Sequence, residues 1–217
     1  MKSVLPILFN NSDFVVVNKP AGILSVPSRM GKSDPRPVVG LILQEQLSAQ
    51  LFPVHRLDFE VSGILLFAKT QAAHTIANRW FEQKIITKTY CALTSGIAPA
   101  VGQHMEWKSK ILRGKKRAYE SPVGKESLTK AQFLGLQSSY LKWQLQPITG
   151  RAHQLRFDLS RHGFPIVGDK LYGSGVSYLP EQIALRAFSL QFPAEAQKFN
   201  LPNEIVIASD FQIPDES

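Results

Sequence analysis

The 217-residue sequence has one cysteine, Cys91, and no long hydrophobic run. A single cysteine excludes an internal disulfide and a zinc site built on cysteines. The apolar patch near the N-terminus ends at Asn10, too early for a secretory signal, and no apolar run approaches the length of a membrane span. We therefore expect a cytoplasmic protein that does not associate with membranes.

Acidic residues are scarce beside basic ones. The chain carries 25 Lys and Arg against 17 Asp and Glu, a formal net charge of +8. Such a balance favours anionic partners such as nucleic acid, although many basic proteins are merely soluble. The five histidines show no metal-ligand spacing, and Gly31-Lys32-Ser33 lacks the first glycine of a phosphate-binding loop. These two signatures of a metal site and a phosphate-binding loop therefore fail.

Strands and helices are predicted in mixed order. Apolar runs and period-2 alternation indicate strands near residues 14–17, 64–68, 87–94, 141–145, 183–192 and 204–208. Such a mixture favours an α+β domain around a mostly antiparallel sheet. The length suits one compact domain over residues 1–217, and we expect a monomer because no long exposed apolar face is evident.

Three stretches have helical spacing. The first follows Asp34-Pro35, read as an N-cap and first helical residue, with its spacing carried by Val38, Leu41, Ile42, Glu45 and Leu47. The second is capped by Thr70 and has the apolar face Ala73, Ile76, Ala77, Trp80 and Phe81. The third runs from Arg151 to His162, capped by Thr149 at its start and by Gly163 just past its end.

The segment from Lys108 to Lys130 is polar and basic. It shows neither helical nor strand period, so an exposed hairpin or loop is expected rather than a core element. Its centre is a cluster of basic residues, Arg113, Lys115, Lys116 and Arg117. Clustering makes these residues candidates for contacts to a nucleic-acid backbone, and a plain solvated loop is the alternative.

The stretch HRLDFEVSGILLFAKT, from His55 to Thr70, places one acid, Asp58, between Arg56 and a buried apolar run. A carboxylate beside a rigid strand is costly to leave unpaired, so it needs a fixed cation or a chemical role. The simpler alternative is that Asp58 caps a turn or balances Arg56.

Candidate partners for Asp58 lie on the third predicted helix. The spacing of His153 and Arg156 would turn both to one side, while Leu155 and Leu159 face the interior. An arginine held in this way is a bidentate partner for a carboxylate or a phosphate, and Asp58 is the obvious carboxylate. A surface phosphate contact or a plain surface cation on the helix is the alternative for Arg151 and Arg156.

Four segments in order resemble the RluA-type RNA pseudouridine synthases: FVVVNKPAGILSVPS, HRLDFEVSGILLFAKT, KTYCALTSG and PITGRAHQLRFDLSRHGFPIVGDKLYG. The resemblance implies the pseudouridine synthase catalytic fold in a short, single-domain form without an S4-type RNA-binding domain. It also implies isomerisation of specific uridines in ribosomal RNA, transfer RNA or both, without a cofactor or metal.

The resemblance assigns roles to individual residues. The catalytic aspartate falls on Asp58, the active-site tyrosine on Tyr90 and the basic partner on Arg156. Arg56 would occupy the gap left by the flipped nucleotide. Further substrate contacts are expected from His55, Arg151, His153, Lys115, Lys116 and Arg117. Two positions depart from the family pattern: Val61 replaces the usual Thr, and Arg186 stands where His is common.

Two other functions fit parts of the sequence. One is an RNA-binding or ribosome-assembly factor that keeps the fold but has little activity. The other is a glycoside or nucleoside hydrolase that uses Asp58. Hydrolases usually pair two carboxylates, whereas the nearest second acid, Glu60, would alternate to the other face of an extended segment.

Overall fold

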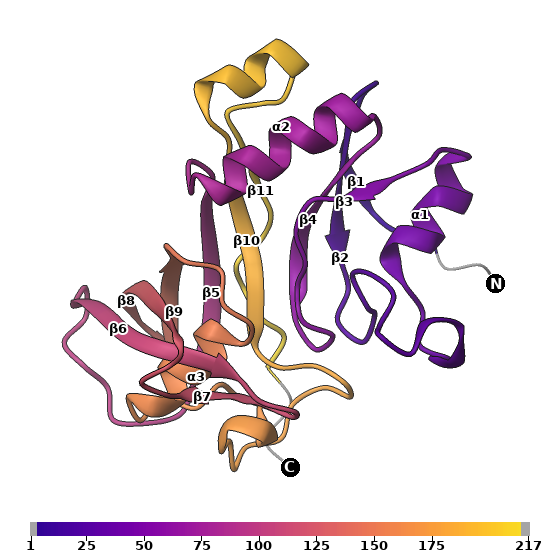
Figure 1. The fold of residues 1–217 in the computed structure, drawn as a ribbon. Helices are drawn as coiled ribbons and strands as arrows, with labels where there is room; N and C mark the ends of the chain where they lie inside the picture. The colour runs from indigo at the N-terminus through magenta and orange to yellow at the C-terminus, as the bar shows by residue number, and fades with distance from the viewer. Residues whose placement is uncertain (1–3, 214–217) are drawn as a thin grey trace. The chain divides into compact units, whose positions relative to one another are not determined.

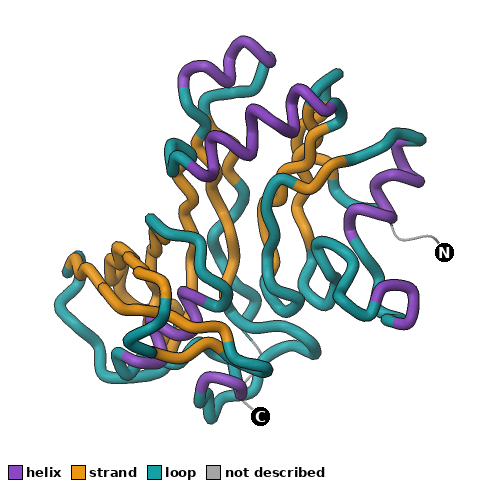
Figure 2. The backbone as a smooth tube through the Cα atoms, in the orientation of Figure 1, coloured by secondary structure: helices purple, strands orange, loops and turns teal. Residues whose placement is uncertain are grey.

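A computed structural model describes residues 4–213, except for the side chain of Lys32, and strands dominate it (Figures 1 and 2). The chain divides into two compact units. Unit 1 comprises the residues up to Thr87 together with Phe188–Ile207, and unit 2 comprises Lys88–Ala187 together with the residues from Ala208 onward. The expectation of one domain over residues 1–217 stays a prediction.

The strands of unit 1 are β1 (Ile7–Asn10), β2 (Phe14–Lys19), β3 (Phe52–Pro53), β4 (Ser62–Ala68), β10 (Leu185–Gln191) and β11 (Glu204–Val206). The boundary with unit 2 crosses β10 after Ala187. The order is β1-β2-β4-β10, with β3 on β4 and β11 on β10. Nearly every residue of β2 and β4 is buried, which confirms the predicted strands with two covered faces.

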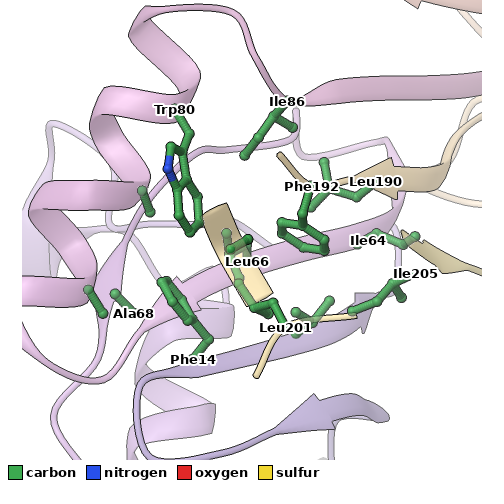
Figure 3. Close-up of a cluster of buried hydrophobic side chains, with 14 residues drawn as sticks. Phe14, Ile64, Leu66, Ala68, Trp80, Ile86, Leu190, Phe192, Leu201 and Ile205 are labelled. Carbon is green, nitrogen blue, oxygen red and sulfur yellow. The ribbon is translucent and has the colours of Figure 1, made fainter. Parts of the chain in front are cut away.

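Helix α2 (Gln71–Glu82) covers the central strands of unit 1. The Thr70 hydroxyl accepts a hydrogen bond from the Ala73 N–H at 3.1 Å, which confirms the predicted cap. Figure 3 shows Trp80 of α2 beside Phe14 and Leu66, and the Phe14 and Trp80 rings stack at 5.9 Å. This cluster makes the β2–β4 framework rigid.

Helix α1 (Val39–Leu47) begins later than predicted. The expected cap, Asp34, instead binds the neighbouring Arg36 through both carboxylate oxygens, at 2.9 and 2.7 Å. The buried positions of α1 are Val39 and Leu43, whereas Leu41 is exposed. A local ion pair therefore replaced the predicted cap.

The strands of unit 2 are β5 (Thr87–Thr94), whose first residue still belongs to unit 1, β6 (His104–Arg113), β7 (Ala118–Glu120), β8 (Lys125–Gln137) and β9 (Tyr140–Pro147). They pair antiparallel in the order β5-β9-β8-β6-β7. Alternate residues of β9 are buried, as its period-2 pattern predicted. Together, the mixed elements and antiparallel pairs of both units confirm the predicted α+β class.

The basic segment 108–130 is more ordered than expected. Residues 113–118 form the predicted exposed hairpin turn between β6 and β7, and residues 121–124 form a second turn. The flanking residues 108–112 and 125–130 belong to the long strands β6 and β8, so the expectation of a loop was wrong for them. Only two residues of β6, Trp107 and Ile111, are buried. They are four positions apart, because the inward position between them is the polar Ser109. The sequence therefore lacks the apolar residue at every second position by which a strand is recognised.

Helix α3 (Gln154–Arg161) begins at Gln154 rather than at Arg151 as predicted. His153 has a left-handed backbone with φ of 55° and cannot continue a helix backwards. The Thr149 hydroxyl does not cap the helix backbone. It donates to the Gln154 side-chain oxygen at 2.8 Å, and the Arg151 N–H donates to the same oxygen at 3.0 Å. Gln154 therefore holds residues 149–151 as a turn.

The remaining short 3₁₀ turns are η1 (Gly31–Ser33), η2 (Lys170–Tyr172) and η3 (Ala194–Phe199). Within residues 4–213, none of the helices combines the length and the apolar character that a membrane crossing requires.

Candidate active site

Asp58 lies in unit 1, on a turn that leads into β4. The Val61 N–H donates to the Asp58 carbonyl at 3.2 Å, which closes the turn. The side chain of Asp58 is partly buried, while the neighbouring Arg56 is exposed.

Lys19, the last residue of β2, binds the backbone of the turn that carries Asp58. Its side chain is 0% exposed, and its ammonium donates to the carbonyls of Pro20 at 3.0 Å, Phe59 at 3.2 Å and Val61 at 2.7 Å. An ammonium has three donors, so these carbonyls match its full capacity. Burial lowers the pKa of Lys19 to about 8, while the nearby charges of Asp58 and Glu60 raise it.

The preceding side of the turn is held by the segment that follows β2. The Ser25 hydroxyl donates to the Leu57 carbonyl at 2.8 Å and accepts from the Leu57 N–H at 3.0 Å. The Gly22 N–H donates to the Phe59 carbonyl at 2.9 Å. The segment from Lys19 to Ser25 thus clamps the backbone on both sides of Asp58, which fixes where the carboxylate can project.

His55 is built into the framework of unit 1. Its Nε2 atom accepts a hydrogen bond from the Leu66 N–H at 3.1 Å, which requires the neutral form with the proton on Nδ1. The ring stacks on Phe81 of α2 with centroids 4.8 Å apart. His55 therefore fixes the segment that leads to Asp58 against β4 and α2. Its predicted contact with a substrate stays a prediction.

Arg156 lies in unit 2 and is buried, which contradicts its reading as a surface cation. Its side chain is 2% exposed, and that of Asp169 is 1% exposed. The Nε and Nη2 atoms donate to the two oxygens of Asp169 at 2.7 and 2.8 Å. This bidentate pair fixes the plane of the guanidinium, so Asp169 is a positioning residue for Arg156.

Tyr172 completes the surroundings of Arg156. Its ring centre lies 5.4 Å from the guanidinium carbon of Arg156. Its hydroxyl accepts from the Ala118 N–H at 2.7 Å and lies 3.1 Å from His153 Nδ1. Burial raises the pKa of Tyr172 to about 12, so the phenol stays protonated at neutral pH.

The two remaining basic sites of unit 2 differ in how firmly they are held. Arg151 is partly buried, and its Nε atom donates to the Glu126 carbonyl at 2.8 Å. The basic cluster occupies the turn between β6 and β7, which is closed by a hydrogen bond from the Gly114 N–H to the Arg117 carbonyl at 3.0 Å. Its side chains are all exposed: Arg113, Lys115, Lys116 and Arg117.

Tyr90 lies on β5 opposite Leu145 of β9 and is partly buried. The residues that follow it on β5 are fully buried on both faces. The strand therefore emerges from the core at Tyr90, where a ring can meet a ligand. In the described residues no group of three or more His, Cys, Asp or Glu side chains could hold a metal ion.

Comparison with known proteins decides the family. Residues 13–161 match the family model described as RNA pseudouridylate synthase. The chain belongs to this family.

Three relatives show how far the likeness extends. An uncharacterized RNA pseudouridine synthase of Bacillus subtilis is 32% identical over 86% of this chain, which spans 63% of that protein's length. The dual-specificity RNA pseudouridine synthase RluA of Vibrio vulnificus is 32% identical, with 86% of this chain and 76% of that protein covered. Among solved structures, human RNA pseudouridylate synthase domain containing 1 has 29% identity and a TM-score of 0.73, covering 89% of this chain and 80% of that one. These matches confirm the resemblance to RluA-type synthases.

The two departures from the pseudouridine synthase pattern have structural roles. Val61 is buried and supplies a carbonyl to Lys19. Arg186 donates from Nη1 to the carbonyls of Ala208 at 3.2 Å and Asp210 at 3.1 Å, and its guanidinium lies over Phe211. Arg186 thus binds the C-terminal segment of unit 2.

Sequence reasoning missed three supporting residues: Lys19 at the Asp58 turn in unit 1, and Asp169 and Tyr172 around Arg156 in unit 2. All three lie inside the four segments that carry the family resemblance. A signal was available for Asp169, since it is the one acid in an otherwise apolar and glycine-bounded stretch that follows α3. Lys19 gave a similar signal, as a charge at the end of a strand whose first four residues are apolar.

Proposed function

We propose that this synthase isomerises specific uridines of ribosomal RNA, transfer RNA or both to pseudouridine, with Asp58 as its catalytic residue. The observation that carries the proposal is the turn that holds Asp58. Its backbone is fixed by the buried Lys19 ammonium and by Ser25, within the 13–161 match to the family. A carboxylate held so firmly suits a reaction that needs one accurately placed acid.

The isomerisation breaks the bond between N1 of uracil and C1′ of ribose and makes a bond between C5 and C1′. The proton on C5 leaves and N1 gains a proton, so nothing is oxidised or reduced and no cofactor is required. Asp58 acts as nucleophile or as base when the glycosidic bond opens. Attack on the sugar, attack on the base and removal of a sugar proton all remain open.

The other proposed roles follow the family assignment. Arg156 keeps Asp58 ionised, because an opposite charge favours the charged form of a carboxylate. The Tyr90 ring stacks on the uracil, and its hydroxyl assists removal of the C5 proton. The target must leave its stack at a cost of roughly a few kcal/mol, and Arg56 fills the gap that it leaves.

Contacts to the RNA backbone complete the proposal. They come from the partly buried His55, Arg151 and His153 and from the exposed basic turn, Lys115, Lys116 and Arg117. Lysine and arginine contacts to phosphates release counterions and offset the cost of extruding the nucleotide. We propose that the protein works as a single catalytic domain and a monomer in the cytoplasm.

The test uses ribosomal and transfer RNA labelled with tritium at C5 of uridine, prepared from cells that lack the protein. Isomerisation releases the C5 tritium to water, whereas binding alone releases none. We expect release by the wild type, none by Asp58→Asn, and full release by the control Glu82→Gln, which changes an exposed acid of unit 1.

Two results would contradict the proposal. RNA binding without tritium release by the wild type would favour the RNA-binding or assembly factor. Release of free labelled uracil would favour a hydrolase.

A further inference from the structure

Lys88 is a partly buried cation of unit 2 that has no role in the proposed chemistry. It lies on β5 two residues before Tyr90, so the two side chains project from the same face of the strand. Both are partly buried, at the end of the strand where the core opens. Lys88 thus lies beside the residue that is proposed to stack on the target base.

The ammonium of Lys88 reaches the turn that precedes α3. A Cβ atom added at Gly150 would lie 3.9 Å from Lys88 Nζ. The turn is fixed by Gln154, which binds both the Thr149 hydroxyl and the Arg151 N–H. Because Gly150 is exposed and has no side chain, the ammonium faces a position that a ligand can approach.

Lys88 differs from the other buried cations in having no protein partner. Lys19 donates to three carbonyls, and Arg156 is paired with Asp169. Over residues 4–213 the structure gives Lys88 no hydrogen bond and no ion pair, and burial alone lowers its pKa. A partly desolvated ammonium without a protein acceptor is well placed to bind an anionic ligand.

The chemistry of the ligand follows from the charge. Uracil and ribose are neutral at working pH, and the phosphodiester is the anionic group of RNA. A lysine ammonium binds phosphate as a point charge, and the interaction is stronger where water is excluded than on an exposed turn. A phosphate at Lys88 would also restrain the nucleotide whose base lies on Tyr90.

We propose that Lys88 binds a backbone phosphate next to the target uridine and so anchors the extruded nucleotide over Tyr90. The proposal rests on the proposed function and goes beyond it by assigning a specific phosphate site to unit 2. This site is distinct from the basic turn, whose lysines are exposed and surrounded by water.

The first test measures access to the amine. The protein is acylated at about pH 8 with an N-hydroxysuccinimide ester, with and without the C5-tritiated RNA, and modification of each lysine is measured by mass spectrometry. We expect RNA to protect Lys88 by roughly tenfold and to leave Lys198, an exposed lysine of unit 1, unchanged. Equal acylation of Lys88 with and without saturating RNA would overturn the proposal.

The second test separates a phosphate contact from simple coverage. RNA affinity is measured over a range of salt concentrations for Lys88→Met, Lys88→Arg and the control Lys198→Met. Loss of one phosphate contact reduces the slope of log affinity against log salt by about 0.7–0.9. We expect this reduction for Lys88→Met, its recovery in Lys88→Arg, and none for the control. A wild-type slope in a folded Lys88→Met protein would overturn the phosphate site.

Folding does not confound the test, because Lys88→Met removes an unpaired buried charge and should unfold at the same temperature as the wild type or higher. A second substitution, Gly150→Asp, places a carboxylate beside the ammonium and should lose the same part of the slope. Gly150→Ala is its matched control. Failure of the proposed function would appear separately, as absence of tritium release by the wild type.

Discussion

Asp158 allows a quantitative prediction about stability that is independent of catalysis. The carboxyl lies on α3 with 0% exposure and accepts hydrogen bonds from Thr129 at 2.6 Å and Ser109 at 3.5 Å. Burial raises its pKa from 3.8 to about 6, although these hydrogen bonds and the charge of Arg161 lower it in part. The folded protein therefore holds this proton more tightly than the unfolded chain.

The sign of the effect follows from that difference. Below pH 3.8 the carboxyl is protonated in both states and folding carries no penalty. As the pH rises through about 6, the folded state has to accept a buried charge, and the full penalty is about 3 kcal/mol. Asp158→Asn removes the charge, keeps an acceptor for Thr129 and offers a donor to Ser109.

We therefore expect Asp158→Asn to raise the free energy of unfolding by about 3 kcal/mol at about pH 7.5 and by about 1 kcal/mol at about pH 4.5. Urea unfolding at both pH values measures the two gains. Asp210→Asn is the control, since Asp210 is exposed, is paired with Lys142 and should give no gain. Equal gains at the two pH values, or a loss at neutral pH, would refute the account of Asp158.

Three further substitutions test other parts of the structure. Lys19→Met should lower the free energy of unfolding by about 2 kcal/mol and slow tritium release, because three carbonyls, that of the buried Val61 among them, lose their donor; unchanged urea unfolding would contradict this. Asp169→Asn should cost about 3 kcal/mol in the same assay, since it breaks the buried pair with Arg156; retention of full stability would show that the pair is not needed. Replacement of Lys115, Lys116 and Arg117 by alanine should lower the slope of log RNA affinity against log salt concentration by about 2. A slope equal to that of the wild type would show that the basic turn does not contact the RNA.

The parts of the fold that were predicted correctly have local causes. The buried runs of β2 and β4 and the alternation on β9 are properties of a few consecutive residues. The cap of α2 is similar, because Thr70 binds the N–H of Ala73 within one turn. Such features can be read from sequence without knowledge of the tertiary structure.

The starts of two helices were mispredicted because the expected capping side chains form hydrogen bonds with other side chains instead of with the helix backbone. Asp34 binds Arg36 and leaves α1 uncapped, while Thr149 binds the side chain of Gln154. Both residues have good capping chemistry, so sequence preference alone favours the wrong role. The hydrogen bonds that decided the outcome depend on backbone turns that local propensity does not specify.

The supports of the candidate site depend on contacts between distant residues. Lys19 binds the Val61 carbonyl across 42 positions of the chain, and nothing in the sequence near Lys19 indicates that partner. Arg156 was predicted to meet the carboxylate of Asp58, whereas its pair with Asp169 inside unit 2 was not foreseen. Asp58, Tyr90 and Arg156 themselves were assigned from the family resemblance, and their roles stay predictions.

The most direct test of the central claim is a transcriptome-wide map of pseudouridine in three strains, with the wild-type chain, without it, and with Asp58→Asn. The account predicts that one or a few sites in ribosomal or transfer RNA disappear both in the deletion strain and in the Asp58→Asn strain. An unchanged map in the deletion strain, or full modification by Asp58→Asn, would contradict it.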